Sequence, residues 1–261
     1  MKDFHVFAVC AYQDSPYLEA CIRSVTRQSY PTKTIVCTST PSPMIEGLAK
    51  KYHLPLFIRE GKSDILADWN FAYQMADARF VTIAHQDDIY RKNYVKTLVS
   101  YAKRFSDITL FTTDSITVKG KKPIPVERLR IVKKLLRIPL RVPYWNHVSF
   151  IKKSVFRFGN SICCPACTYN KERSGEVLFT SYCKFALDWE HGIDMAEKPG
   201  RFICVEEPLV FHRIHQDAAT SVCMQDSRRY QEELQIFKRL WPEKIAECFM
   251  KFYQKAYDSY K

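Results

Sequence analysis

The first half of the chain alternates short apolar runs with segments of helical spacing, and few folds accommodate that pattern. Apolar runs that predict β-strands occupy residues 5–10, 34–37, 54–58, 80–84 and 108–112. Between them, apolar residues at helical spacing predict helices that begin at Ser15, near Ile45, at Ser63 or Asp64, and near Val95. This alternation predicts an α/β fold, in which a mostly parallel sheet is flanked by helices on both faces.

The second half is less regular until Asp226, after which helical spacing returns. Tyr230, Leu234 and Phe237 share one helix face, and Pro242 begins another helix. We therefore expect residues 1–118 and 119–225 to form two parts of one α/β domain. A helical tail follows over residues 226–261.

The composition allows a packed core and indicates an anionic partner. Of the 261 residues, 46% are hydrophobic, and the formal net charge is +12. The apolar run after Met1 ends at Tyr12, too early for a signal peptide, and no run approaches the ~18 apolar residues of a membrane span. We therefore expect a cytoplasmic protein.

Two adjacent carboxylates, Asp87 and Asp88, come directly after the apolar run at residues 80–84. Ligands of open α/β sheets bind beyond the carboxyl ends of the strands. A divalent cation would relieve the repulsion between the carboxylates, and Mg²⁺ or Mn²⁺, completed by substrate phosphates, is the expected ion. On the residues alone the alternative stays open that Asp88 caps the next helix and that Asp87 is solvated.

The order of the motifs resembles that of the family 2 glycosyltransferases, which have the GT-A fold. The motifs are Ala11-Tyr12-Gln13-Asp14 after the first strand, Gly61 to Asn70, and then His85-Gln86-Asp87-Asp88-Ile89-Tyr90 after the fourth strand. The resemblance extends from His5 to about Ser221. Two positions depart from it: Cys37-Thr38-Ser39-Thr40 replaces the usual Val-Asp-Asp-Gly-Ser, and His85 replaces an aspartate.

The resemblance implies a nucleotide-sugar donor, with a UDP-sugar expected, and a site for Mn²⁺ or Mg²⁺ at its diphosphate. Asp88 and His215 are the expected metal ligands. Arg213 and His215 lie two apart on an extended segment, so their side chains share one side of it. The residues expected to bind the donor are Ala11, Tyr12, Asp14, Ser39, Asp68, Gln86, Asp87 and Arg213.

Asp188 is the residue to which the resemblance gives the role of catalytic base. The run Phe185-Ala186-Leu187-Asp188-Trp189-Glu190 looks like the second acidic motif of the family, in which an aspartate opens a helix. Inverting transfer needs a carboxylate that removes the proton of the acceptor hydroxyl. The alternative is that Asp188 only caps the helix, and Glu190 is the next candidate for the base.

A basic and apolar segment covers residues 128–141, and no acidic residue occurs between Arg128 and Lys171. Three interpretations stay open: a helix on the domain, a peripheral contact with the inner face of an anionic membrane, or a nucleic-acid contact. Members of the resembled family build lipid-linked or surface glycans, so we favour the membrane and expect no nucleic acid. Arg130, Lys134 and Arg137 are then expected to bind lipid phosphates.

Two other motifs are discounted. Gly61-Lys62-Ser63 lacks the earlier glycine of a phosphate-binding loop, because Leu56 stands at that position. Cys164-Pro165-Ala166-Cys167 has the spacing of a redox or zinc motif, but it lies mid-chain without the thioredoxin-type context or a second ligand pair.

The sequence thus predicts an inverting glycosyltransferase that moves a sugar from a nucleoside-diphosphate donor to a hydroxyl of a glycan or lipid-linked acceptor, in surface polysaccharide synthesis. One alternative is a nucleotidyltransferase, although such enzymes normally have a Gly-rich phosphate loop near the N-terminus. The other is a non-catalytic basic module that binds membrane or nucleic acid.

Overall fold

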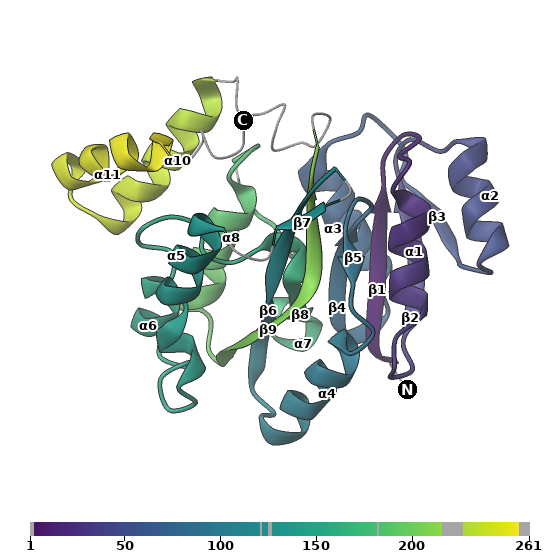
Figure 1. Ribbon diagram of the computed structural model, residues 1–261, viewed down its shortest axis with the longest axis horizontal. Helices are drawn as coiled ribbons and strands as arrows, with labels where there is room; N and C mark the ends of the chain where they lie inside the picture. Colours follow the sequence, from purple (N-terminus) through teal and green to yellow (C-terminus); the bar gives the residue numbers. More distant parts are fainter. Residues whose placement is uncertain (1–2, 121, 125–126, 182, 216–226, 256–261) are drawn as a thin grey trace.

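The computed structural model describes residues 3–255 except for residues 121, 125–126, 182 and 216–226. Its centre is a nine-stranded sheet with the order β3-β2-β1-β4-β8-β6-β9-β5, and β7 pairs with β6 (Figure 1). The strands are β1 (Asp3–Ala11), β2 (Lys33–Thr38), β3 (Leu56–Ile58), β4 (Ala78–His85), β5 (Ile89–Tyr90), β6 (Ile108–Lys119), β7 (Lys122–Ile124), β8 (Cys167–Asn170) and β9 (Arg201–Ile214).

The helices are α1 (Leu18–Thr26), α2 (Pro43–Lys51), α3 (Ile65–Met75), α4 (Tyr94–Arg104), α5 (Arg128–Leu136), α6 (Ser149–Ser154), α7 (Lys171–Ser174), α8 (Leu187–Glu197), α10 (Ser227–Leu240) and α11 (Glu243–Lys255). Two 3₁₀ turns, η1 (Ile138–Arg141) and η2 (Cys164–Ala166), join them. In the described ranges no helix is both long and apolar enough to cross a bilayer.

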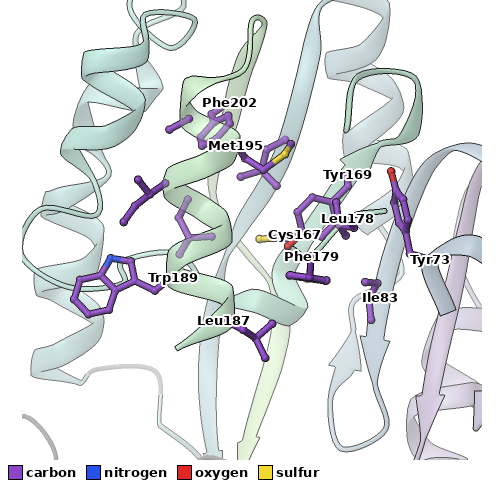
Figure 2. Close-up of a cluster of buried hydrophobic side chains, with 14 of the residues drawn as sticks. Tyr73, Ile83, Cys167, Tyr169, Leu178, Phe179, Leu187, Trp189, Met195 and Phe202 are labelled. Carbon is purple, nitrogen blue, oxygen red and sulfur yellow. The ribbon is translucent and has the colours of Figure 1, made fainter. Parts of the chain in front are cut away.

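The three strand pairings of the first half follow the predicted β-α-β pattern. β1 pairs in parallel with β2 and β4, and β2 pairs in parallel with β3. Alternate residues of β1 face opposite layers: Phe7 packs with α1 and α4, whereas Ala8 packs with α3 and α8. The α/β fold with helices on both faces is therefore confirmed, and Figure 2 shows the side chains buried beneath α8.

The prediction of a mostly parallel sheet is confirmed, since the long pairing of β6 with β9 in the second half is also parallel, but this half adds short antiparallel strands that the sequence did not predict. β8 lies between β4 and β6 and is antiparallel to both, so the sheet is mixed. β8 has only four residues, two of them polar, and all are buried. Their polar groups are satisfied across the sheet, since Thr168 bonds to Thr82 and the Asn170 amide donates to the carbonyl of Ile108. Such a strand has no apolar run that periodicity could detect.

The helix predicted to begin at Ser15 begins at Leu18 instead. The Ser15 hydroxyl makes no capping bond to this helix; it accepts the Tyr17 N–H at 3.3 Å and donates to the Asp87 carboxylate at 3.0 Å. By contrast, Asp64 caps α3 by accepting a bond from the Ala67 amide, as the sequence indicates.

The C-terminal helices α10 and α11 pack against the α6–α8 side of the sheet, at the far end from α1 and α2 (Figure 1). The ring of Phe237 on α10 lies edge-on to that of Trp189 on α8, with centroids 5.0 Å apart. Ala246 and Met250 of α11 are fully buried. This packing joins the tail to the cluster that underlies α8.

The basic segment 128–141 does not present all its charges to the outside. Asp114 of β6 is buried and accepts bonds from Arg130 and Arg137, each with a shortest distance of 2.6 Å. Arg137 is itself only 3% exposed. The expectation that Arg130 and Arg137 bind lipid phosphates is therefore wrong, because both guanidinium groups anchor α5 to the sheet.

Candidate active site

A cleft of about 270 Å³ opens beyond the carboxyl end of β4, and both Asp88 and Asp188 line it. β4 supplies His85 and the acidic turn after it, whereas α8 supplies Asp188 from the opposite wall. Asn160, α5 and α10 complete the walls. Two carboxylate groups that are 100 residues apart in the sequence therefore face one shared space.

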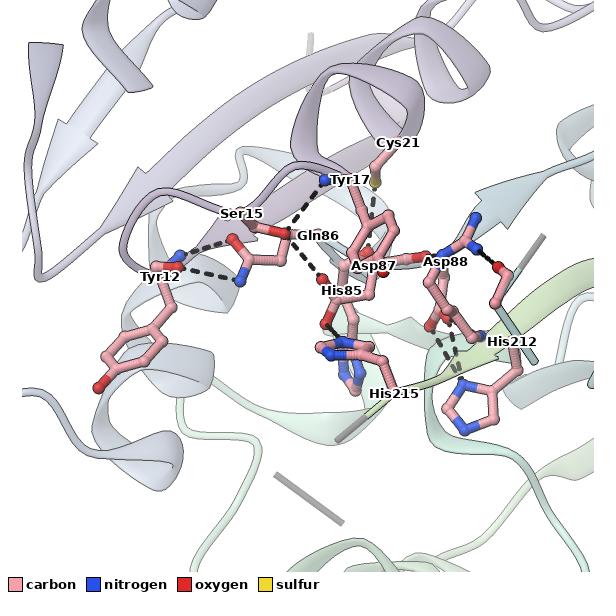
Figure 3. Close-up of polar contacts among 12 residues, drawn as sticks. Tyr12, Ser15, Tyr17, Cys21, His85, Gln86, Asp87, Asp88, His212 and His215 are labelled. Carbon is pink, nitrogen blue, oxygen red and sulfur yellow. Dashed lines mark hydrogen bonds and ion pairs between the residues drawn. The ribbon is translucent and has the colours of Figure 1, made fainter. Parts of the chain in front are cut away.

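Asp88 is fixed by β9. The short strand β5 pairs antiparallel with β9, which brings Asp88 against His212 and Arg213. Asp88 is 1% exposed, and its Oδ1 accepts the Arg213 backbone N–H at 2.9 Å and lies 3.2 Å from His212 Nδ1 (Figure 3). Through these contacts the buried Asp88 carboxylate attaches the acidic turn to β9.

Asp87 has more open surroundings. Its Oδ2 lies 3.2 Å from Nε2 of His215, and its Oδ1 accepts the Ser15 hydroxyl (Figure 3). The structure thus brings His215 to Asp87, whereas the imidazole beside Asp88 belongs to His212. A carboxylate and an imidazole nitrogen at this distance are suitable ligands for a divalent cation.

A cation held here would need ligands from the substrate. In the described part of the chain, no group of three or more His, Cys, Asp and Glu side chains could hold a metal ion. Mg²⁺ and Mn²⁺ sites of sugar and phosphoryl transfer use one or two carboxylates plus substrate phosphates, so the Asp87–His215 pair fits such a site.

Arg213 lines the cleft, but two of its nitrogens bond to the main chain. Nε donates to the Asp87 carbonyl at 3.1 Å, and Nη1 donates to the Gly120 carbonyl at 2.5 Å. The guanidinium carbon also lies 4.4 Å from the centre of the Tyr17 ring. The side chain that the sequence assigns to the diphosphate therefore also fixes the acidic turn.

The other predicted donor residues gather at the ends of β1 and β2, beside the cleft. Gln86 bonds to both backbone groups of Tyr12, and the Tyr12 ring is 48% exposed. The Ser39 hydroxyl donates to Asp68 at 2.9 Å, and Arg59 binds the same carboxylate at 2.7 Å. Asp14, three residues after buried Ala11 at the end of β1, accepts the Ser42 hydroxyl. These groups can hold a base and a ribose, with the aromatic ring exposed for stacking.

Asp188 is the second residue of α8, and two donors hold its carboxylate. Oδ2 accepts the Asn160 amide at 2.8 Å, and Oδ1 accepts the Trp189 backbone N–H at 2.9 Å. Burial raises the pKa of Asp188, while the positive charges of Lys133 and Arg229 act in the opposite direction. A carboxylate of this kind can accept a proton.

Sequence patterns gave no indication of several residues at the site. Asn160 follows an irregular loop, and His212 is part of the predicted closing segment without a role of its own. Ser15 was expected to cap a helix. The continuation of the closing segment over residues 218–221 lies outside the described residues. The roles of Asn160, His212 and Ser15 are identified only by the side chains that they contact in the folded protein.

The paired cysteines behave as apolar side chains. Cys164 and Cys167 are free thiols, and burial raises the pKa of both above the ordinary value. Protonated thiols are poor metal ligands and weak nucleophiles.

Residues 6–174 match glycosyl transferase family 2, and because this match covers more than half of the chain, the protein belongs to that family and is a glycosyltransferase. The fold is that of the GT-A enzymes. No curated protein sequence matches the chain.

Solved structures of the same fold have low sequence identity to this chain. Staphylococcus aureus TarS residues 1–349 in complex with UDP-GlcNAc is 14% identical, with a TM-score of 0.63 over 95% of this chain and 70% of that one. The mannosyltransferase PcManGT from Pyrobaculum calidifontis in complex with GDP-Man and Mn²⁺ is 15% identical, with a TM-score of 0.64 over the same shares. At these identities the likeness establishes the fold.

Proposed function

We propose that this glycosyltransferase moves a sugar from a nucleoside-diphosphate donor to an acceptor hydroxyl with inversion at the anomeric carbon. The observation that carries the proposal is the shared cleft, in which the acidic turn after β4 faces Asp188. Inversion requires the leaving diphosphate and the base to lie on opposite sides of the sugar. The nucleotide-sugar complexes of TarS and PcManGT support such a donor.

The donor would lie along the ends of β1, β2 and β4. We assign its base to the exposed Tyr12 ring and its ribose to the hydroxyl and carboxylate groups around Ser39 and Asp68. A UDP-sugar is the expected donor, in keeping with the UDP complex of TarS. We assign the diphosphate to the surroundings of Asp87, because this residue lies between the residues assigned to the nucleoside and the cleft that contains Asp188.

We assign the divalent cation, Mn²⁺ or Mg²⁺, to Asp87 and His215. A bound cation neutralises negative charge on the leaving diphosphate. This assignment moves the metal carboxylate from Asp88 to Asp87, because Asp88 is buried and already holds the Arg213 backbone and His212. Asp88 and Arg213 instead fix the turn that carries Asp87.

Asp188 would act as the base. Its carboxylate takes the proton of the acceptor hydroxyl while the acceptor oxygen bonds to the anomeric carbon. The bond from that carbon to the diphosphate oxygen breaks, and the nucleoside diphosphate leaves with the electron pair. Asn160 and the Trp189 N–H hold the carboxylate in place, and the N-terminus of α8 stabilises its charge.

We further propose that the acceptor is a glycan or a lipid-linked glycan of surface polysaccharide synthesis, and that the enzyme works peripherally at the inner face of a membrane. The formal net charge of +12 supports an anionic surface. Exposed apolar side chains on and after α5, including Leu135, Ile138 and Trp145, support contact with lipid.

The test is a hydrolysis screen of nucleotide sugars with Mn²⁺, because slow hydrolysis of the donor needs no acceptor. One nucleotide sugar should be hydrolysed, and its nucleoside diphosphate should raise the melting temperature only when Mn²⁺ is present. Stabilisation by oligonucleotides or anionic vesicles, without hydrolysis of any nucleotide sugar, would instead support the non-catalytic binding module.

A further inference from the structure

An apolar groove of about 440 Å³ lies between α5 and the helices α10 and α11. Its apolar lining is Val132, Leu136, Phe158, Phe237, Phe249 and Phe252. The ring of Phe158 packs on those of Trp241 and Phe249, with centroids 5.5 and 5.3 Å away, which forms an aromatic wall. The volume is in the range of small-molecule sites.

The orientation of α5 explains why the groove stays open. No residue of α5 is buried. The helix is attached to the sheet by the ion pairs that Arg130, and Arg137 directly after the helix, form with Asp114. Its apolar side chains therefore do not enter the protein core. Val132 lines the groove and is 49% exposed, so its side chain remains accessible to a ligand there.

The groove is polar at one end only, and that end opens into the catalytic cleft. The two spaces share five lining residues, which are Leu129, Lys133, Asn160, Arg229 and Tyr253. Asn160 is also the residue that bonds to Asp188. A molecule in the groove would thus have its polar end beside the proposed base and its apolar end between α5 and α11.

We propose that the groove holds the hydrocarbon chain of an amphiphilic acceptor, whose hydroxyl-bearing head reaches Asp188. The inference rests on the proposed function and names the acceptor class for the same site. A second copy of the chain or a protein segment would cover an apolar face, but neither explains why the polar groups lie only at the junction with the cleft. A long apolar chain with a sugar or alcohol head matches both ends.

The test uses a dansyl-labelled dodecyl alcohol as a fluorescent probe, below the concentration at which it forms micelles, with full-length protein. Val132→Glu places a carboxylate in the groove, and Ile131→Glu is its matched control. Ile131 is the neighbouring residue of α5, is also 49% exposed, and does not line the groove. Donor hydrolysis and the melting temperature are measured on the same samples.

We expect one probe to bind per chain, with dodecyl glycosides competing and methyl glycosides failing to compete. Each methylene removed from the competitor should weaken it about threefold to fourfold. Val132→Glu should weaken the probe about tenfold or more, since a carboxylate is costly to bury, and Ile131→Glu should leave it unchanged. Donor hydrolysis should persist in both variants.

Equal effects of the two substitutions, or no saturable probe binding, would overturn the inference while leaving donor hydrolysis as support for the proposed function. A dimer that Val132→Glu dissociates, without probe binding, would assign the groove to a second copy of the chain. If the wild-type protein hydrolyses no nucleotide sugar, the proposed function fails whatever the probe does.

Discussion

The amide of Asn160 donates to Oδ2 of Asp188 at 2.8 Å, across 28 residues of the chain. Burial raises the pKa of Asp188, and a hydrogen bond donated to a carboxylate favours its charged form, so we expect the Asn160 amide to oppose this rise. The bond also sets the direction in which the carboxylate points. Asn160 is therefore a positioning residue for the proposed base.

Asn160→Ala should lower the rate of transfer and change its dependence on pH. A protonated Asp188 cannot act as the base, so kcat/KM falls as the pH drops through the pKa of this carboxyl group. Loss of the amide raises that pKa further, and the acid limb should move to higher pH. The measurement is the pH profile of kcat/KM. Ser161→Ala removes another bond of the same loop without touching Asp188, and it should leave the profile in place.

Asp87→Ala should abolish the part of nucleoside-diphosphate binding that depends on Mn²⁺, because Asp87 is the open carboxylate beside His215. Thermal shift with the diphosphate, with and without Mn²⁺, measures this part. Asp88→Asn should mainly lower the melting temperature of the free protein, because the Asp88 carboxylate is buried and accepts the Arg213 backbone N–H. If Asp88→Asn alone removed the metal-dependent shift, the assignment to Asp87 would be wrong.

Glu233→Gln should make the protein more stable above neutral pH. Glu233 of α10 is 2% exposed, and burial raises its pKa to about 7. Between its unfolded pKa near 4.5 and this value the folded protein holds the extra proton, so stability falls as the pH rises through the window. The variant lacks this loss, which amounts to about 3 kcal/mol at most. Urea unfolding at pH 5 and pH 8 should give similar stabilities at pH 5 and a more stable variant at pH 8.

Asp114→Ala should destabilise the protein by about 3–5 kcal/mol, because it leaves the buried Arg137 charge without its partner. The measurement is the urea midpoint. Asp107→Ala is the matched control, since it breaks a partly exposed pair with Arg201 and should cost about 1 kcal/mol. Equal losses in the two variants would show that Asp114 is not the anchor of α5.

Periodicity predicted the first half of the fold because each strand and helix there buries one regular face. Phe7 and Ala8, adjacent on β1, face different layers as strand alternation requires. The acidic turn could be predicted for a similar reason, since Asp87 follows a buried strand directly. Asp188 was identified from a motif rather than from a pattern of burial.

The remaining features depend on partners that are distant in the sequence. β8 is a strand because Thr168 and Asn170 find partners on β4 and at the start of β6. α5 has the apolar spacing of a packed helix, but Asp114 turns its arginines toward the sheet instead. A local pattern contains no information about a single buried carboxylate on another strand.

The central claim is that Asp188 removes the acceptor proton, and Asp188→Asn tests it most directly. The rate of transfer should fall about 10²–10⁴-fold, while the affinity for the nucleoside diphosphate with Mn²⁺ stays within a factor of about two. Asp194→Asn on the same helix, whose carboxylate pairs with Arg239 outside the cleft, should keep the wild-type rate. Near-normal transfer by Asp188→Asn would contradict the account and would direct attention to Glu190.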